Sequence, residues 1–311
     1  MRFPDSVRIV EVGPRDGLQN EAAAVSVGAR ISLIEALAEA GLVAIESGSF
    51  VSPRWVPQMA ATPDVFSGLR RLPGVSYSTL VPNLKGLDAA LACGVREIAV
   101  FASASESFSQ HNINCSISES LVRIQAVTQA AMTRGLRVRA YVSCVLGCPY
   151  EGEIGFDAIV RVAQTLYEMG CYEISLGDTI GVGTPLKARR LLETICARVP
   201  MQAVAVHFHD TWGQALANIL ASLEVGVSVV DSSVSGLGGC PHAPGAAGNV
   251  ATEDVLYMLH GMGIHTGVIL EKVAAAGIMI CRQLGRAPAS KAALALSSRS
   301  CLPSEANAVH E

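Results

Sequence analysis

Short apolar segments alternate with helical patterns between residues 7 and 260, and this alternation constrains the fold of the 311-residue chain more than any other feature. The predicted strands cover residues 7–12, 42–46, 75–80, 96–101, 137–143, 172–176, 203–209 and 228–233. The predicted helices cover residues 26–40, 84–93, 117–134, 156–169, 184–198, 213–225 and 250–260, with a shorter one within 55–71. Such alternation indicates a parallel sheet. Eight units in about 250 residues favour an α/β fold of the (β/α)8 TIM-barrel type.

An open, doubly wound sheet is the alternative fold, because periodicity alone does not show that a sheet closes. No Gly-x-Gly-x-x-Gly follows the first predicted strand, which argues against the usual dinucleotide-binding domain. We predict a catalytic barrel over residues 1–265 and a C-terminal extension over residues 266–311. The extension combines a helix over residues 268–285 with a partly mobile tail, rich in Ala, Ser and Pro, packed on or near the barrel.

The composition excludes several classes of function. Charged residues make up 16% of the chain, the net charge is −4 and no basic run occurs, so nucleic acid is not an expected partner. No apolar segment approaches the roughly 20 residues of a membrane-spanning helix. The N-terminus has no apolar signal region, which predicts a cytoplasmic protein without a leader. The nine cysteines form no Cys-x-x-Cys pair, which argues against a disulfide framework.

Reactive side chains gather where the predicted strands end. They are Arg15 and Asp16 after the first strand, Glu46 at the end of the second, Asp178 after the sixth, and His207 and His209 at the end of the seventh. Each one alone could form a turn, an ion pair or a helix cap. In a (β/α)8 barrel, however, the carboxyl ends of the strands carry the active site. The coincidence of these side chains on one rim therefore favours a polar, metal-binding active site.

His207 and His209 are candidate metal ligands, because side chains at i and i+2 of a strand point to the same face. The alternative is a pair of structural histidines. Asp16 and Asn249 would add oxygen atoms to the set, although Asn249 could instead cap the last helix. Such a mixed set suits Mg²⁺, Mn²⁺ or Co²⁺, with substrate oxygens at the open positions.

A long glycine-rich loop over residues 236–249 follows the last predicted strand and contains Cys240. Its length and composition suit a lid better than a fixed ligand. A cysteine on a closing lid can act as a general acid or base once water is excluded. The alternative is an inert loop thiol.

Several motifs resemble those of one enzyme family. Gly13-Pro14-Arg15-Asp16-Gly17-Leu18-Gln19-Asn20-Glu21 closely resembles the opening motif of 3-hydroxy-3-methylglutaryl-CoA (HMG-CoA) lyases, which are related to isopropylmalate and homocitrate synthases. Further similar segments follow in order at residues 49–59, 105–108, 112–115, 141–144, 148–152, 177–181, 207–211, 236–241 and 248–254. The resemblance covers the chain from about residue 7 to residue 260 without large gaps.

The resemblance implies a (β/α)8 barrel that cleaves an HMG-type acyl-CoA to acetyl-CoA and acetoacetate, as in leucine degradation and ketone-body formation. It implies Mg²⁺ or Mn²⁺ as the cofactor, an acyl-CoA as the substrate and a homodimer as the assembly. The implied metal ligands are Asp16, His207, His209 and Asn249. The implied catalytic group is Arg15, Glu46, Asp178, His207 and Cys240, with Arg15 and Gln19 binding substrate.

The implied reaction explains these residue types. Breaking the carbon–carbon bond requires that a tertiary hydroxyl group lose its proton and that a thioester enolate be stabilised and protonated. Arg15 would hold the enolate oxygen, and Cys240 would protonate the enolate from the lid. Either His207 or Asp16 would accept the hydroxyl proton, with His207 preferred. Glu46 and Asp178 would orient Arg15 and the ligands.

Three positions depart from the family pattern: Ala22 where Lys is common, Gly285-Arg286-Ala287 where Asn-Arg-Lys is common, and His242 where Tyr is common. The first two weaken the expected hold on CoA and leave room for a longer 3-hydroxy-3-alkylglutaryl-CoA as substrate. A nearby imidazole could also lower the pKa of the lid thiol. Two rival functions are a Claisen-type synthase of the same superfamily and a non-catalytic protein that binds metal or CoA.

Overall fold

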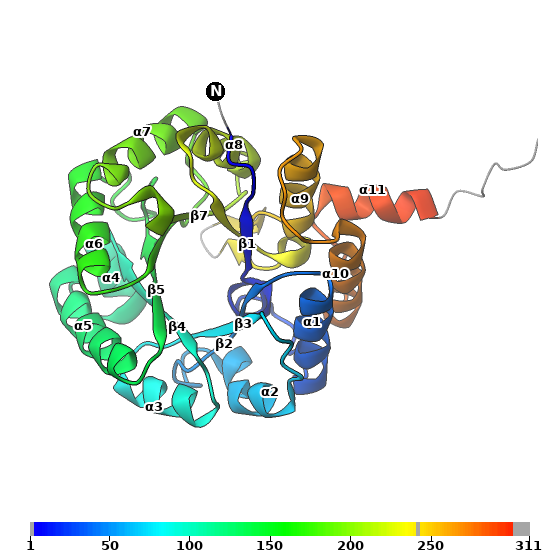
Figure 1. Ribbon diagram of the computed structural model, residues 1–311, viewed down its shortest axis with the longest axis horizontal. Coiled ribbons are helices and arrows are strands. Elements are labelled where there is room, and N and C mark those ends of the chain that lie inside the picture. The colour runs from blue at the N-terminus through cyan, green and yellow to red at the C-terminus, as the bar shows by residue number, and fades with distance from the viewer. Residues whose placement is uncertain (1–2, 241–242, 301–311) are drawn as a thin grey trace, which may run out of the picture.

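The structure is a computed structural model that describes residues 3–240 and 243–300, except for the side chains of residues 240–247, 299 and 300. Eight strands form a closed parallel barrel in chain order (Figure 1). They are β1 (Arg8–Glu11), β2 (Ala44–Ser49), β3 (Ser76–Leu80), β4 (Glu97–Ser103), β5 (Arg137–Ser143), β6 (Glu173–Asp178), β7 (Val204–Phe208) and β8 (Val229–Ser232). Each strand overlaps its predicted range, and the predicted fold class is confirmed.

The barrel closes because β1 pairs in parallel with both β2 and β8. Arg8 lies opposite Val229 and Glu11 opposite Ser232, so the whole of β1 is in register with β8. This pairing excludes the open, doubly wound sheet. Because the pairing closes the ring, the carboxyl ends of all eight strands meet at one mouth.

Helices surround the barrel (Figure 1). Those that follow the strands in turn are α1 (Val27–Glu39), α2 (Thr62–Gly68), α3 (Leu84–Ala92), α5 (Ile117–Thr133), α6 (Phe156–Glu168), α7 (Pro185–Cys196), α8 (Ala215–Val225) and α9 (Thr252–Gly261). Side-chain caps fix several helix starts: Ser26 caps α1, Asn83 caps α3, and Ser116 forms a capping box with Glu119 on α5. Short 3-10 turns occur at Pro57–Met59 and Met201–Ala203.

Three more helices lie outside this repeat: α4 (Glu106–Ile113), α10 (Leu270–Leu284) and α11 (Lys291–Ser300). The sequence predicted α10 but neither α4, which is short and polar, nor α11. Helix α10 packs against α1, and α11 packs against α9 and α10, so the C-terminal extension lies on the barrel. The tail predicted to be partly mobile is thus helical over residues 291–300, and residues 301–311 lie outside the described residues.

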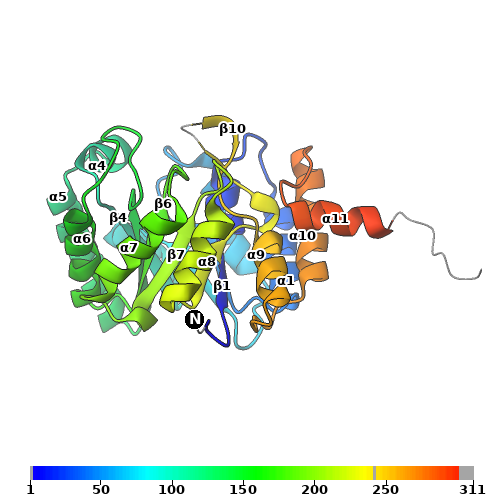
Figure 2. The same cartoon turned by 90° about the horizontal axis from the view of Figure 1, so that it is seen from above.

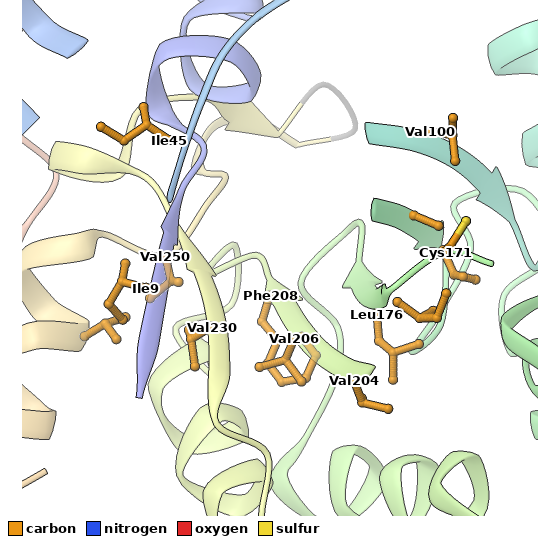
Figure 3. Packing of buried hydrophobic residues seen from close by; sticks show 14 of the residues in the cluster. Ile9, Ile45, Val100, Cys171, Leu176, Val204, Val206, Phe208, Val230 and Val250 are labelled. Atoms are coloured by element: carbon orange, nitrogen blue, oxygen red, sulfur yellow. The ribbon is translucent and has the colours of Figure 1, made fainter. Parts of the chain in front are cut away.

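The main hydrophobic core lies between the strands and the helices. Alternate residues of the strands, such as Val206, Phe208 and Val230, point outward into this layer, as Figure 3 shows. Their neighbours in sequence, Ala205, His207 and Asp231, face the inside of the barrel. The inside of the barrel therefore holds buried polar groups such as His207 and Asp231.

Loops at the carboxyl ends of the strands carry three irregular elements. A π-helical turn, η1 (Gly13–Gly17), follows β1, and a 3-10 turn, η4 (Val234–Gly236), follows β8. The predicted glycine-rich loop contains a two-stranded hairpin, β9 (Gly239–Cys240) and β10 (Ala243–Ala247). Figure 2 shows this hairpin at the end of the barrel opposite to the N-terminus. Among the described residues, every helix is too short or too polar to cross a membrane.

Candidate metal centre and active site

Three predicted metal ligands, Asp16, His207 and His209, meet at the mouth of the barrel. Asp16 lies in η1, His207 lies in β7, and His209 follows that strand. One ligand atom of each residue lies within 4.8 Å of the others. The Nε2 atom of His207 and the Oδ2 atom of Asp16 are 3.9 Å apart. Because a cation binds each such atom at about 2.1 Å, this separation suits a cation between the two.

Asn249, the fourth predicted ligand, lies beside this group. Its backbone pairs with that of His209 in an isolated bridge. Its Nδ2 atom donates hydrogen bonds to Asp16 Oδ2 at 2.8 Å and to the Leu237 carbonyl at 3.3 Å. Rotation of the amide group would turn its oxygen toward the same point. The four side chains therefore fit a divalent cation with mixed nitrogen and oxygen ligands.

The carboxylate of Asp16 is ionised at neutral pH. Burial would raise the pKa of Asp16, but the charge of Arg15, the two histidines and the hydrogen bond from Asn249 lower it to about 2. A carboxylate ligand must be deprotonated to bind a metal. Asp16 thus meets this condition across the physiological pH range, and for the same reason it is a weak base.

Arg15 and Glu46 form a buried ion pair next to the candidate metal centre. The Nε atom of Arg15 donates to Glu46 Oε2 at 2.5 Å, and its Nη1 atom donates to Asp16 Oδ1 at 2.6 Å. Glu46 is fully buried, its other oxygen has no hydrogen-bond partner among the described residues, and burial raises its pKa. The guanidinium group is therefore held in one orientation by two carboxylates.

Close backbone packing fixes the turn that carries Arg15 and Asp16. A Cβ atom at Gly17 would lie 2.7 Å from the Cβ atom of Leu237 and from the Oγ atom of Ser233. Only glycine allows so close an approach. The turn after β1 is thereby pressed against the chain that leads into the β9–β10 hairpin.

Asp231, which the sequence did not single out, contacts His207 from the opposite side. Its Oδ2 atom lies 3.3 Å from His207 Nδ1 and also accepts hydrogen bonds from Ser175 and Arg139. Arg139 binds both oxygens of Asp231, at 3.0 and 2.6 Å, and donates to Glu173 at 2.6 Å. Burial alone would raise the pKa of Asp231, but Arg139 and His207 hold it well below its usual range. His207 therefore faces a permanent buried carboxylate.

A signal for this network was present in the sequence. Arg139, Glu173 and Asp231 are charged residues next to apolar residues of their strands. A charge in such a strand is rarely tolerated unless it is paired, so each of these residues marked a polar position inside the barrel. Which of them would meet depended on the closure of the sheet.

Asp178 and Gln19 lie at the mouth in different settings. The carboxylate of Asp178 accepts hydrogen bonds from the backbone N–H groups of Val182 at 3.2 Å and Gly183 at 2.8 Å, so it caps the loop after β6. Burial raises the pKa of Asp178 to about 6. The Nε2 atom of Gln19 lies 3.5 Å from Asp16 Oδ1. The catalytic role of Asp178 and the substrate-binding role of Gln19 stay predictions.

The backbone of Cys240 belongs to β9, but its side chain and the whole of His242 lie outside the described residues. The base of the hairpin is described. There the Oε1 atom of Glu21 lies 2.9 Å from Arg286 Nη2 and accepts a hydrogen bond from Gly238 N at 3.3 Å. This contact brings the two segments that depart from the family pattern, at Ala22 and at residues 285–287, to one place beside the β9–β10 hairpin.

The opposite side of the barrel carries an apolar cluster. Leu80, Ala99 and Tyr141 form a cluster with Val51 and Phe101 that is separate from the outer core. The ring of Tyr141 lies 5.8 Å from that of His207 and 5.6 Å from the Cζ atom of Arg15. Tyr141 therefore joins the apolar cluster to the polar centre.

Comparison with known proteins agrees with this geometry. The profile of the family described as HMGL-like matches residues 6–280. A 3-hydroxy-3-isohexenylglutaryl-CoA/hydroxy-methylglutaryl-CoA lyase of Pseudomonas aeruginosa is 58% identical over 96% of this chain and 100% of its own. The mitochondrial hydroxymethylglutaryl-CoA lyase of Bos taurus is 58% identical over 94% of this chain and 90% of its own.

A solved structure extends the likeness to three dimensions. The crystal structure of hydroxymethylglutaryl-CoA lyase from Pseudomonas aeruginosa superposes with a TM-score of 0.95 at 58% identity, covering 96% of this chain and 100% of that one. The resemblance expected from the motifs is confirmed. The barrel, the four side chains at its mouth and these matches together place the chain in the HMGL-like family.

Proposed function

We propose that the chain is a divalent-metal-dependent lyase that cleaves HMG-CoA to acetyl-CoA and acetoacetate. The observation that carries the proposal is the meeting of Asp16, His207 and His209 beside the buried Arg15–Glu46 pair. A cation bound there, which we propose to be Mg²⁺ or Mn²⁺, would polarise the hydroxyl group and the distal carboxylate of the substrate. The relatives whose names specify HMG-CoA support this substrate.

The carbon–carbon bond that breaks joins the hydroxyl-bearing carbon to the methylene group next to the thioester. The hydroxyl oxygen loses its proton and becomes the ketone of acetoacetate, while the electrons of the broken bond form the enolate of acetyl-CoA. We assign the enolate oxygen to Arg15, because its guanidinium group is buried and oriented by two carboxylates. We assign protonation of the enolate carbon to Cys240.

We assign acceptance of the hydroxyl proton to His207 rather than to Asp16, whose pKa of about 2 makes it a poor base. Because Nδ1 of His207 faces Asp231, Nε2 is the ring nitrogen available at the centre. One lone pair cannot bind a cation and a proton at once. We therefore propose that Asp16, His209 and Asn249 would hold the cation, and that Nε2 of His207 would serve either as a further ligand or as the acceptor of the hydroxyl proton.

The CoA end of the substrate would leave the barrel beside the hairpin. Glu21 and Arg286 meet there, next to positions where relatives of this type commonly carry lysine. Arg286 is the nearby cation that could contact a phosphate group. We propose that this region holds the CoA moiety more weakly than a lysine-bearing site would.

A longer 3-hydroxy-3-alkylglutaryl-CoA is the second candidate substrate, because one 58% identical relative is named for a 3-isohexenyl compound as well as for HMG-CoA. We also propose a cytoplasmic homodimer that acts in leucine degradation and ketone-body formation. Sedimentation of the purified chain would test the homodimer. The growth of a deletion strain on leucine would test the role in leucine degradation.

The decisive experiment is a coupled assay with HMG-CoA on metal-stripped protein, with and without added Mg²⁺ or Mn²⁺. We expect equal amounts of acetyl-CoA and acetoacetate once metal is restored. Metal binding without turnover would identify the non-catalytic rival. Release of free thiol from acetyl-CoA and a 2-oxo acid, with no cleavage of HMG-CoA, would identify the synthase.

A further inference from the structure

The mouth of the barrel has two chemically different sides. Strand β7 and the segments that follow β1, β7 and β8 carry the candidate metal ligands. The strands β3, β4 and β5 carry Leu80, Ala99, Phe101 and Tyr141, and the segment after β2 carries Val51. We call these five side chains the apolar wall. A substrate in this mouth therefore meets ligands and charges on one side and hydrocarbon on the other.

Strand pairing makes the apolar wall continuous. Leu80 lies opposite Ala99, and Phe101 lies opposite Tyr141 in the parallel register. Ala99 and Phe101 lie two residues apart on β4 and so share one face of the strand. Ile98 and Val100, between and beside them, belong to the outer core instead. The wall is thus an inward-facing surface of the barrel.

Part of the apolar wall remains accessible. Phe101 and Val51 are only partly buried, whereas most apolar side chains of the strands are fully buried. Apolar surface inside an otherwise polar mouth gains free energy when a hydrocarbon group covers it. The contacts of Tyr141 with His207 and Arg15 place this surface next to the reacting groups.

The substrate has one group that matches this surface. Its reacting carbon bears the hydroxyl group, a carboxymethyl arm, a thioester arm and an alkyl group. In the function proposed above, the hydroxyl and carboxylate oxygens face the metal ligands, and the thioester oxygen faces Arg15. The alkyl group has no polar partner and is left to face the apolar wall.

We propose that Val51, Leu80, Phe101 and Tyr141 form a subsite for the 3-alkyl substituent, and that this subsite accepts chains well beyond methyl. A methyl group covers little of a surface that includes two aromatic rings and two aliphatic side chains, whereas a branched chain of about six carbons covers more of it. The inference rests on the proposed lyase function. It predicts that 3-hydroxy-3-isohexenylglutaryl-CoA is cleaved as well as HMG-CoA.

The test compares kcat/KM for the two substrates in the wild type and in Phe101→Asn, Phe101→Leu and Leu186→Asn. Leu186 is exposed on α7 and does not belong to the apolar wall, so Leu186→Asn serves as the control. We expect Phe101→Asn to lower kcat/KM for the isohexenyl substrate at least about tenfold more than for HMG-CoA, because the longer chain loses more apolar contact. Phe101→Leu and Leu186→Asn should keep the ratio of kcat/KM for the two substrates within about twofold of the wild-type ratio.

Two results would overturn the subsite. One is a wild type that cleaves HMG-CoA but not the isohexenyl substrate. The other is a Phe101→Asn variant in which both substrates lose activity by the same factor. A wild type that cleaves neither substrate would instead refute the lyase function itself. Thermal unfolding and metal titration of each variant would show that it is folded. Ala99→Val adds two methyl groups to the wall and offers a second, wholly apolar test. It should also lower kcat/KM for the isohexenyl substrate more than kcat/KM for HMG-CoA.

Discussion

The Nδ1 atom of His207 lies 3.3 Å from the Oδ2 atom of Asp231, and this contact decides which ring nitrogen of His207 faces the candidate metal centre. Asp231 itself accepts hydrogen bonds from the Nη1 and Nη2 atoms of Arg139 and from the hydroxyl group of Ser175. A carboxylate on one nitrogen of a histidine fixes the ring and directs the other nitrogen to the metal. The buried network inside the barrel therefore orients a ligand at its mouth.

Replacing Asp231 with Asn should weaken metal binding roughly 10- to 100-fold, which is the usual effect of losing a carboxylate that orients a histidine ligand. Isothermal titration of the metal-stripped protein with Mn²⁺ would measure this change. Ser175→Ala is the matched control, because it removes another hydrogen bond to the same oxygen while keeping the carboxylate. Equal affinities in Asp231→Asn and the wild type would show that the contact has no influence on the centre.

His207→Ala and His209→Ala should differ in a diagnostic way. For His209→Ala we expect a loss of metal affinity greater than the roughly 10- to 100-fold typical of an orienting residue, since a direct ligand is removed. For His207→Ala we expect turnover to fall by a larger factor than affinity, even at saturating metal, because a proton carrier is lost as well. Unchanged metal stoichiometry and affinity in His209→Ala would contradict its assignment as a ligand.

Cys240→Ser and Cys240→Ala should both lower kcat by roughly 10²- to 10⁴-fold, the usual contribution of a general acid, while metal affinity is retained. The pair separates loss of the thiol proton from a change in side-chain size. Cys93→Ala, at a cysteine on the outer part of the barrel, provides the comparison. Near-normal turnover in both variants would remove Cys240 from the mechanism.

Glu253 should make the fold less stable as the pH rises. Burial raises the pKa of Glu253 from about 4.5 to about 8, and the neighbouring Glu11 adds to the shift. Since the folded protein holds the proton more tightly than the unfolded chain, the stabilising contribution is complete below about pH 4.5 and is lost as the pH rises through about 8.

Glu253→Gln removes the titrating carboxyl group and should flatten the pH dependence of the free energy of unfolding. Relative to the wild type, the free energy of unfolding of the variant should rise by roughly 3–5 kcal/mol between pH 5 and pH 9. Urea unfolding at several pH values would measure it, with Glu193→Gln on the exposed face of α7 as the control. If the difference in the free energy of unfolding between Glu253→Gln and the wild type stays constant across this pH range, the pKa of Glu253 is not raised.

Much of the fold followed from local pattern. The eight strands and the helices between them are set by the spacing of apolar residues, because a strand or helix must bury one face. Helix α4 escaped prediction because its sequence is polar and short, and α11 because its composition resembles that of a tail. These two helices owe their form to packing and capping that a periodic pattern does not record.

The side chains of the candidate centre were also visible in the chain. Asp16, His207 and His209 lie at or just after strand ends, where parallel strands of a barrel converge, and Asn249 ends the loop after β8. The contact between Asp231 and His207 and the apolar wall beside Tyr141 were not visible. Those relationships join residues on different strands, and they exist only because the sheet closes and turns alternate side chains inward. Sequence alone fixed which groups could react, whereas barrel closure decided which of them meet, since distances across the barrel depend on register and not on position in the chain.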